Sequence, residues 1–183
     1  MQVPTRKQPE SPLGSNTMGH LPLPNVTLRP LTLSDIDFLL QLVCDPQVHQ
    51  YIPELIMDMN MLENWLQNLS QQDHEYLVLC GEEKIGECNL TLTKDNAEIG
   101  LMLLPRFWGQ GYGSAIMEKL LAMAKKLQLK ELTATTSEKN KACLSLLHRY
   151  GFTKEAHVLA ILFPDIPSEG DNYLFLHKEL KEA

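Results

Sequence analysis

The chain has 183 residues, of which 44% are hydrophobic, and a formal net charge of −7. This length suits one domain with a full hydrophobic core. The acidic balance argues against nucleic acid as the main partner, because phosphate backbones attract clustered Lys and Arg. It fits an amine-bearing substrate, although the same charge also serves solubility.

The four cysteines predict neither a metal site nor a redox pair. They form no C-x-x-C pair and no Cys/His cluster with zinc spacing, and a mid-sized intracellular enzyme explains them more simply than disulfides do. No apolar run approaches the ~20 residues of a membrane span, and the first residues lack a signal-peptide pattern. We therefore expect a cytoplasmic protein without a membrane partner, acting as a monomer or a homodimer.

The N-terminal third predicts a tail, a strand and two helices. Residues 1–24 hold five prolines, so we expect a flexible tail before a single domain over residues 25–183. Residues 26–31 alternate like an edge strand. A helix capped by Ser34 and a second helix at 57–69 follow, with a loop at 45–54 between them. Their apolar stripes are Ile36, Leu39, Leu40 and Val43, then Met61, Leu62, Trp65, Leu66 and Leu69.

The remaining chain predicts six more strands and two more helices. A Gly81-Glu-Glu turn joins the first two strands as a hairpin, and Gly151 closes the last helix. The order predicts an α+β fold with a mixed, mostly antiparallel sheet of about seven strands and helices on both faces. The strands are expected at 76–80, 84–92, 96–104, 129–136, 152–163 and 173–180, the helices at 113–127 and 140–149, and a loop at 164–171.

Glycine alternates with larger residues in the stretch Arg106-Phe-Trp-Gly-Gln-Gly-Tyr-Gly-Ser114. It follows an apolar run and precedes an amphipathic helix, whose start offers unpaired N–H groups and a positive dipole end. Such a loop binds a phosphate or pyrophosphate, although a tight turn without a ligand would use the same glycines. The lysine of a P-loop is missing, and the last glycine comes one residue too early for a dinucleotide fingerprint.

Four motifs occur in order: Glu98-Ile-Gly, Trp108-Gly-Gln-Gly-Tyr, Asn140-Lys-Ala-Cys and Gly151-Phe. In this combination the chain resembles the GNAT superfamily of N-acetyltransferases, and within it the branch of the ribosomal-protein N-terminal acetyltransferases. The resemblance covers about residues 26–180. It implies acetyl-CoA as cosubstrate, no metal, and an amine acceptor such as a protein N-terminus or a small molecule.

The resemblance also implies a coenzyme site. The loop of Gly109, Gln110, Gly111, Tyr112, Gly113 and Ser114 would hold the pyrophosphate with its main chain, with the side chains of Gln110 and Tyr112 turned away. Trp108 stands where the family often has Arg or Gln, which removes one polar contact. The strand before the loop would splay from the next parallel strand, and the main chain of Leu101, Met102 and Leu103 would line the pantetheine arm. Asn140 is either a helix N-cap or a ligand of that arm.

Acetyl transfer also needs a base for the amine and an acid for the departing thiolate. Glu98, at the branch's Glu-Ile-Gly motif, and Glu87, on the preceding strand, are the candidate bases, and surface carboxylates are the alternative reading for both. The superfamily's usual Tyr is replaced by Leu147. Cys143, where the branch has Ser, is then either a proton donor whose helix-start position lowers its pKa or a small buried filler.

Two other functions compete with the acetyltransferase. The missing Tyr and the Cys143 replacement are compatible with an inactive CoA-binding sensor or interaction module. A nucleotide-binding module is the third reading of the loop. CoA stabilisation and release of thiol from acetyl-CoA distinguish the three.

Overall fold

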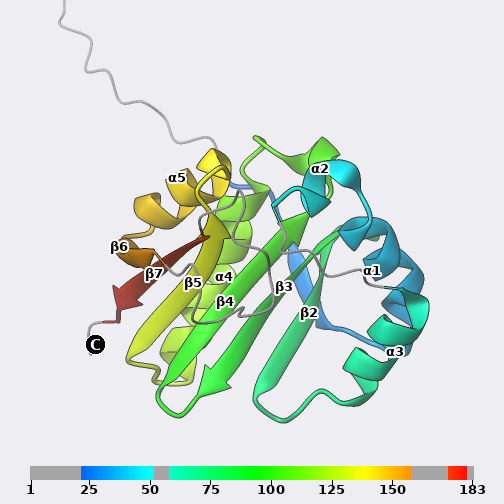
Figure 1. The fold of residues 1–183 in the computed structure, drawn as a ribbon, viewed down its shortest axis with the longest axis horizontal. Helices are drawn as coiled ribbons and strands as arrows, with labels where there is room; N and C mark the ends of the chain where they lie inside the picture. Colours follow the sequence, from blue (N-terminus) through cyan, green and yellow to red (C-terminus); the bar gives the residue numbers. More distant parts are fainter. Residues whose placement is uncertain (1–21, 52–57, 158–172, 181–183) are drawn as a thin grey trace, which may run out of the picture.

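The structure is a computed structural model that describes residues 22–51, 58–157 and 173–180. In this part of the chain, seven strands form one sheet in the order β1-β2-β3-β4-β5-β7-β6 (Figure 1). Only β4 and β5 pair in parallel. The fold class, the strand number and the edge position of the first strand are thus confirmed. The strands are β1 (Thr27–Pro30), β2 (Asp73–Cys80), β3 (Glu83–Thr93), β4 (Asn96–Leu103), β5 (Glu131–Ser137), β6 (Thr153–His157) and β7 (Tyr173–Glu179).

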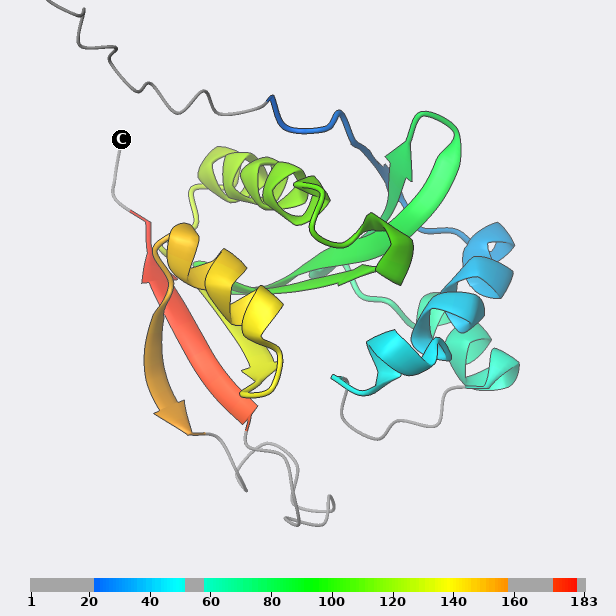
Figure 2. The same cartoon turned by 90° about the horizontal axis from the view of Figure 1, so that it is seen from above.

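Helices cover both faces of the sheet, as expected (Figure 2). On one face, Ile116 and Leu120 of α4 join the main core with β-strand residues. On the other face, α1 and α2 pack on β2 through a second cluster that contains Leu42, Val48 and Leu77. The helices are α1 (Ile36–Val43), α2 (Pro46–His49), α3 (Met59–Gln67), α4 (Tyr112–Lys126) and α5 (Lys141–Arg149), with short 3-10 turns η1 (Leu33–Asp35) and η2 (Pro105–Phe107).

Two tight turns hold β2, β3 and β4 together. Cys80 pairs with Glu83, so the first turn has two residues, and Gly81 takes the positive φ of 61° that such turns require. Thr93 pairs with Asn96, which makes the second turn equally short. β3 therefore occupies one edge of β4 over its whole length. The other edge of β4 faces β5.

Three local expectations are wrong. The helix does not start at Ser34: the chain first forms η1 with Thr32 as its cap, and α1 begins after Asp35. The predicted loop at 45–54 contains α2, because Asp45 caps it by accepting from Gln47 N at 2.9 Å and Pro46 takes the first helical position. Met61 is exposed rather than part of a core stripe. The predictions for residues 1–21, 52–54, 158–163 and 164–171 lie outside the described residues.

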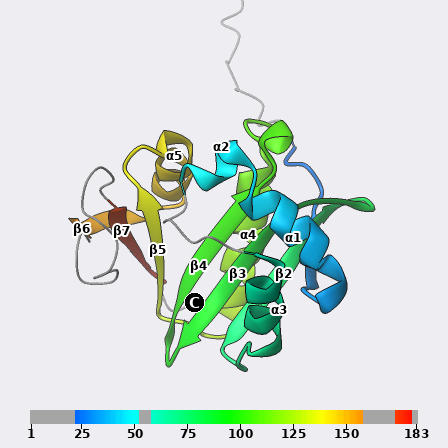
Figure 3. The same cartoon turned by 45° about the vertical axis from the view of Figure 1, so that its right-hand side comes forward.

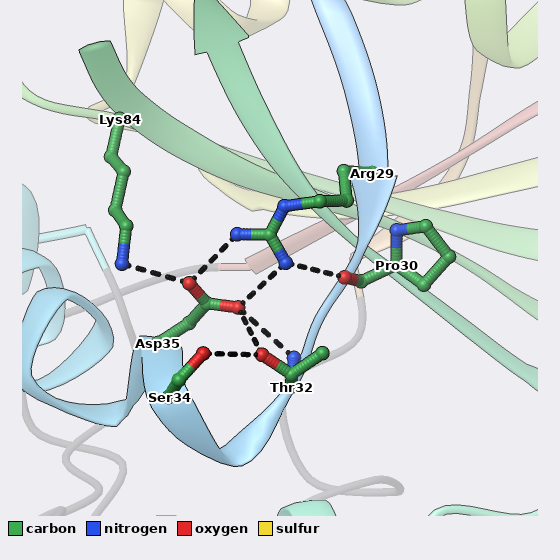
Figure 4. A network of polar contacts seen from close by, with 6 residues as sticks. All are labelled: Arg29, Pro30, Thr32, Ser34, Asp35 and Lys84. Atoms are coloured by element: carbon green, nitrogen blue, oxygen red, sulfur yellow. Dashed lines mark hydrogen bonds and ion pairs between the residues drawn. The ribbon is translucent and has the colours of Figure 1, made fainter. Parts of the chain in front are cut away.

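Asp35 fastens the start of α1 to the sheet (Figure 4). Its buried carboxylate receives Arg29 Nη2 at 2.9 Å and Lys84 Nζ at 2.8 Å, and Thr32 N donates to it at 3.1 Å. Burial alone would raise the pKa of this carboxyl, but these hydrogen bonds outweigh it and hold the pKa well below its ordinary value. One side chain thereby links β1, β3 and the helices that border the face described next.

Candidate active site

The glycine loop has the backbone that its sequence predicts. After η2, Gly109 has a φ of 71° and Gly111 a φ of 88°, and α4 begins at the next residue. Positive φ values of this kind are easily adopted by glycine, which has no Cβ. The loop therefore turns sharply from the end of β4 into the start of a 15-residue helix.

The main-chain donors of this loop are free. Ala115 N donates to Gly111 O at 3.0 Å, the first hydrogen bond of α4. Among the residues that the structure describes, none accepts from the N–H groups of 109–114. Six consecutive unpartnered donors stand at the positive end of the helix dipole, an arrangement that attracts a phosphate group.

The side chains of the loop are bound to protein groups. Trp108 Nε1 donates to Leu103 O at 2.7 Å, and its ring lies 6.4 Å from the ring of Tyr51. Gln110 donates to the carbonyl of Arg106. The Tyr112 hydroxyl lies 3.4 Å from Cys80 Sγ. These three side chains thus already have protein partners, while the main-chain N–H groups of 109–114 have none among the described residues.

A gap opens in the sheet beside the loop. The parallel pairing of β4 with β5 ends at Glu98 and Thr133, and beyond these residues the two strands diverge (Figure 3). β4 stays paired with β3 up to Leu103, and β5 stays paired with β7 up to Ser137. The predicted splay of these strands is present. It leaves the facing edges of β4 and β5 without strand partners, so backbone groups there are available to a bound arm.

Residues 101–103 border this gap with their main chain. Leu101 and Leu103 belong to the core under α4, whereas Met102 packs in the cluster on the opposite face. A Cβ on Gly113 would lie 3.2 Å from Leu146 and 3.9 Å from Leu101, so the start of α4 packs closely against both α5 and β4. Only a glycine allows this approach without a shift of its neighbours.

The start of α5 lies after the far end of β5. Asn140 is its N-cap, because Asn140 Oδ1 accepts from Cys143 N at 3.0 Å. This leaves the amide Nδ2 of Asn140 for other partners. Burial raises the pKa of the Cys143 thiol, although a hydrogen bond with Thr136 opposes this. The expectation that the helix start lowers this pKa is wrong, because the thiol is desolvated.

The two predicted carboxylates share the face of the sheet opposite α4. Cross-strand partners project to the same face of a sheet. Thr91 of β3 pairs with Glu98 of β4, and Glu87 of β3 pairs with Met102 of β4. Because the two residues on each strand are four positions apart, all four side chains lie on one face. Glu98 is exposed, and Thr135 Oγ1 donates to it at 3.1 Å. Glu87 is 5% exposed. Four residues of β4 separate the two positions, about 13 Å at strand spacing, so the carboxylates do not act on one proton directly.

The sequence analysis missed Glu75, the partner of Glu87. Glu75 on β2 is 9% exposed, and its carboxyl group hydrogen-bonds that of Glu87. Burial raises the pKa of both groups, and for Glu87 the neighbouring Glu75 charge adds to the rise. Glu75 belongs to the polar run Asp73-His-Glu at the start of β2, which would normally indicate solvent-facing side chains, so the sequence carried no signal for a buried acid here.

The described residues contain neither a cluster arranged for a metal ion nor a helix able to span a membrane. In those residues, no group of three or more His, Cys, Asp or Glu side chains is arranged to hold a metal ion. Within the same ranges, no helix has the length and apolarity that a bilayer span requires. A hollow of about 420 Å³ lies between residues 23–26 and α4, and none of the carboxylates above lines it.

Comparisons with known proteins agree with this geometry. A family model for the acetyltransferase (GNAT) domain matches residues 25–153. The uncharacterized N-acetyltransferase p20 of Bacillus licheniformis is 29% identical over 142 residues, which are 71% of this chain and 80% of that protein.

Two solved structures share the fold. The spermidine N-acetyltransferase from Vibrio cholerae, in complex with CoA and spermine, aligns with a TM-score of 0.74 at 19% identity, over 84% of this chain and 95% of that one. Mycobacterium smegmatis RimJ in complex with CoA-disulfide aligns with a TM-score of 0.71 at 18% identity, over 84% of this chain and 81% of that one.

Proposed function

The chain belongs to the GNAT acetyltransferase family and is an enzyme of that class, and from this premise we propose that it transfers the acetyl group of acetyl-CoA directly to a primary amine. Residues 25–183 act as one catalytic domain in this proposal. The acceptor is a protein N-terminus or a small-molecule amine. The observation that carries the proposal is the run of free N–H groups at 109–114 beside the open edge of β4.

The loop binds the coenzyme through its diphosphate. Main-chain donors at the start of α4 meet the negative charge, and the side chains of Trp108, Gln110 and Tyr112 only hold the loop in shape. The pantetheine arm then lies along residues 101–103, where the gap leaves strand edges unpaired. Asn140 Nδ2 donates to the same arm. The related V. cholerae and M. smegmatis structures, which contain CoA or its disulfide, support this choice of cosubstrate.

Transfer proceeds through the gap from one face of the sheet to the other. The coenzyme approaches from the α4 and α5 face, and the acceptor approaches from the face with Glu87 and Glu98. A main-chain N–H on the free edge of β4 stabilises the charge that develops on the thioester oxygen. The acidic groups on this face attract the ammonium form of the acceptor, and one carboxylate among them takes its proton.

The thiolate leaves toward α5. The pKa of the Cys143 thiol is raised, so this group remains protonated at neutral pH and can donate its proton. Replacing Cys143 with Ala tests this role, because a proton donor would lower kcat while leaving CoA affinity unchanged. An unchanged kcat would identify Cys143 as a buried filler.

CoA binding and thiol release test the function itself. Saturation at 100 times Kd stabilises the folded state by about 2.7 kcal/mol, which raises Tm by roughly 5–10 °C for a domain of this size. Thiol release from acetyl-CoA is then followed with N-terminal peptides, polyamines and amino acids as acceptors. No Tm shift contradicts the coenzyme site. A Tm shift without thiol release with any amine would indicate a CoA-binding module instead.

A further inference from the structure

Two buried carboxyl groups meet under the acceptor face. Glu75 and Glu87 lie on adjacent strands in diagonal positions, since Leu77 pairs with Glu87 and Glu75 pairs with Asn89. They are 9% and 5% exposed, and they hydrogen-bond each other. A hydrogen bond between two carboxyl groups requires a proton on one of them. Glu87, the more deeply buried group, carries that proton and donates to Glu75.

This pair has no cationic partner in the described chain. Every ion pair found there involves another acid: Asp35, Glu83 or Asp95. Buried carboxylates are costly unless a positive charge compensates them. Among the residues that the structure describes, this buried acid pair thus has no paired counter-charge, which is typical of a site where a cationic ligand binds.

Glu87 lies on the strand next to β4, one strand away from the gap between β4 and β5, and Glu75 lies one strand further away. Glu87 stands opposite Met102, and Asn89 stands opposite Gly100, both on the stretch of β4 that has lost its β5 partner. A Cβ on Gly100 would clash with the amide oxygen of Asn89, so Asn89 covers the bare backbone there. No side chain from Gly100 separates the carboxyl pair from the open edge of β4. Glu87 is therefore the member of the pair that lies nearer to the open edge of β4.

We propose that Glu75 and Glu87 act as one proton-accepting unit, which receives the cationic acceptor amine and takes its proton. The proposal rests on the acetyl transfer described above and assigns its base. One proton passes from the ammonium to the Glu75 carboxylate, and the neutral nitrogen attacks the thioester carbon. The C–N bond forms, the C–S bond breaks, the thiolate takes a proton from Cys143 to become CoA thiol, and the second nitrogen proton restores the Cys143 thiol. The pair then returns its proton to solvent.

The electrostatic surroundings suit this role. Burial raises the pKa of Glu75 to about 7, with the hydrogen bond from Glu87 opposing and the charge of Asp73 adding to the rise. A base of this strength is ionised in part at neutral pH and still accepts a proton readily. The other titratable groups on the packed elements are Asp37 on α1, His49 on α2, Glu63 on α3, Arg29 on β1, His74 and Tyr76 on β2, Lys84 and Cys88 on β3, and Glu98 on β4. The cations Arg29 and Lys84 are paired with Asp35, and the pKa of Glu75 is set by burial, Glu87 and Asp73.

The roles of the two carboxyls predict unequal effects of amide replacement. Glu75→Gln removes the proton acceptor and should lower kcat/KM by about a hundredfold, a typical loss for a general base. Glu87→Gln replaces an O–H donor by an N–H donor and should stay within about fivefold of wild type, because Glu75 keeps its hydrogen bond. The acid limb of the pH profile near pH 7 should disappear in Glu75→Gln. Glu63→Gln, which changes an exposed carboxylate on α3, is the matched control and should leave the profile unchanged.

Two binding measurements keep this test separate from that of the proposed function. CoA should raise Tm equally in wild type and Glu75→Gln, because the coenzyme loop is untouched. Spermidine and n-butylamine, added to the CoA-saturated protein, should raise Tm further in wild type and less in Glu75→Gln. A Glu75→Gln enzyme within threefold of wild type overturns the assignment. The assignment is also overturned if the amines raise Tm equally in wild type and Glu75→Gln. It is overturned too if they raise Tm in neither protein while CoA still does. Loss of the CoA shift in wild type would instead contradict the coenzyme site.

Discussion

Charge at Gly109 offers a sharp test of the diphosphate site. Gly109 is exposed, has a φ of 71°, and a Cβ built on it meets no heavy atom within 4 Å. Asn and Asp tolerate this left-handed conformation better than other residues with side chains. Gly109→Asn and Gly109→Asp therefore impose the same volume and nearly the same backbone cost. They differ by one negative charge beside the N–H groups of the loop.

The expected difference follows from Coulomb's law. One charge at about 6 Å from a diphosphate with two negative charges costs about 1.4 kcal/mol in water-like surroundings, a tenfold change in Kd. Isothermal titration calorimetry at low ionic strength should find CoA about tenfold weaker for Gly109→Asp than for Gly109→Asn. At 1 M salt the ratio should fall toward one, because screening then acts over about 3 Å.

Pantetheine provides the ligand control for this comparison. It lacks the diphosphate, so its affinity should be the same for both variants. Equal CoA affinities of Gly109→Asp and Gly109→Asn at low salt would refute the reasoning. A tenfold difference that persists with pantetheine would also refute it, since the charge would then act on another part of the coenzyme.

Two further predictions concern stability and the α5 cap. Asp35→Asn should lower the free energy of unfolding by about 2 kcal/mol at pH 7, less than a fully buried pair would lose because Arg29 and Lys84 are partly exposed. Since the pKa of Asp35 is depressed in the folded state, its stabilisation is fully present above pH ~4 and is progressively lost at lower pH. Urea titrations would contradict this if the unfolding free energies of wild type and Asp35→Asn differed equally at pH 2.5 and pH 7. Asn140→Asp keeps the oxygen that caps α5 but loses the Nδ2 donor, so Tm should hardly change while CoA binding weakens severalfold. The control is Asn140→Ala, which should lower the stability by about 1 kcal/mol because the cap is lost. If Asn140→Asp binds CoA as tightly as wild type, Asn140 serves only as a helix cap.

Local signals in the sequence were sufficient for most of the fold. The Gly81 turn, the Asn140 cap and the Gly151 helix end depend on side chains and backbone preferences within a few residues. The glycines at 109 and 111 likewise predict the bend from their own conformational freedom. The Asp45-Pro46 pair was misread because the same residues also begin loops; here Asp45 caps a helical turn whose Val48 is buried in the core.

Long-range contacts account for what the sequence did not reveal. Glu75 and Glu87 are 12 positions apart, and only the β2–β3 register brings their carboxyl groups together. The raised pKa of Cys143 results from burial against residues of other elements, which outweighs the local effect of a helix start. Met61 has the spacing of a core residue, but α3 turns that side chain to solvent. Register, burial and the orientation of a helix are tertiary properties that spacing alone does not fix.

A crystal structure of the protein with CoA tests the central claim most directly. The account predicts the diphosphate within hydrogen-bond distance of the main-chain N–H groups of 109–114 and the pantetheine arm between β4 and β5. A diphosphate bound to another surface, or an arm that leaves the gap between these strands empty, would contradict it.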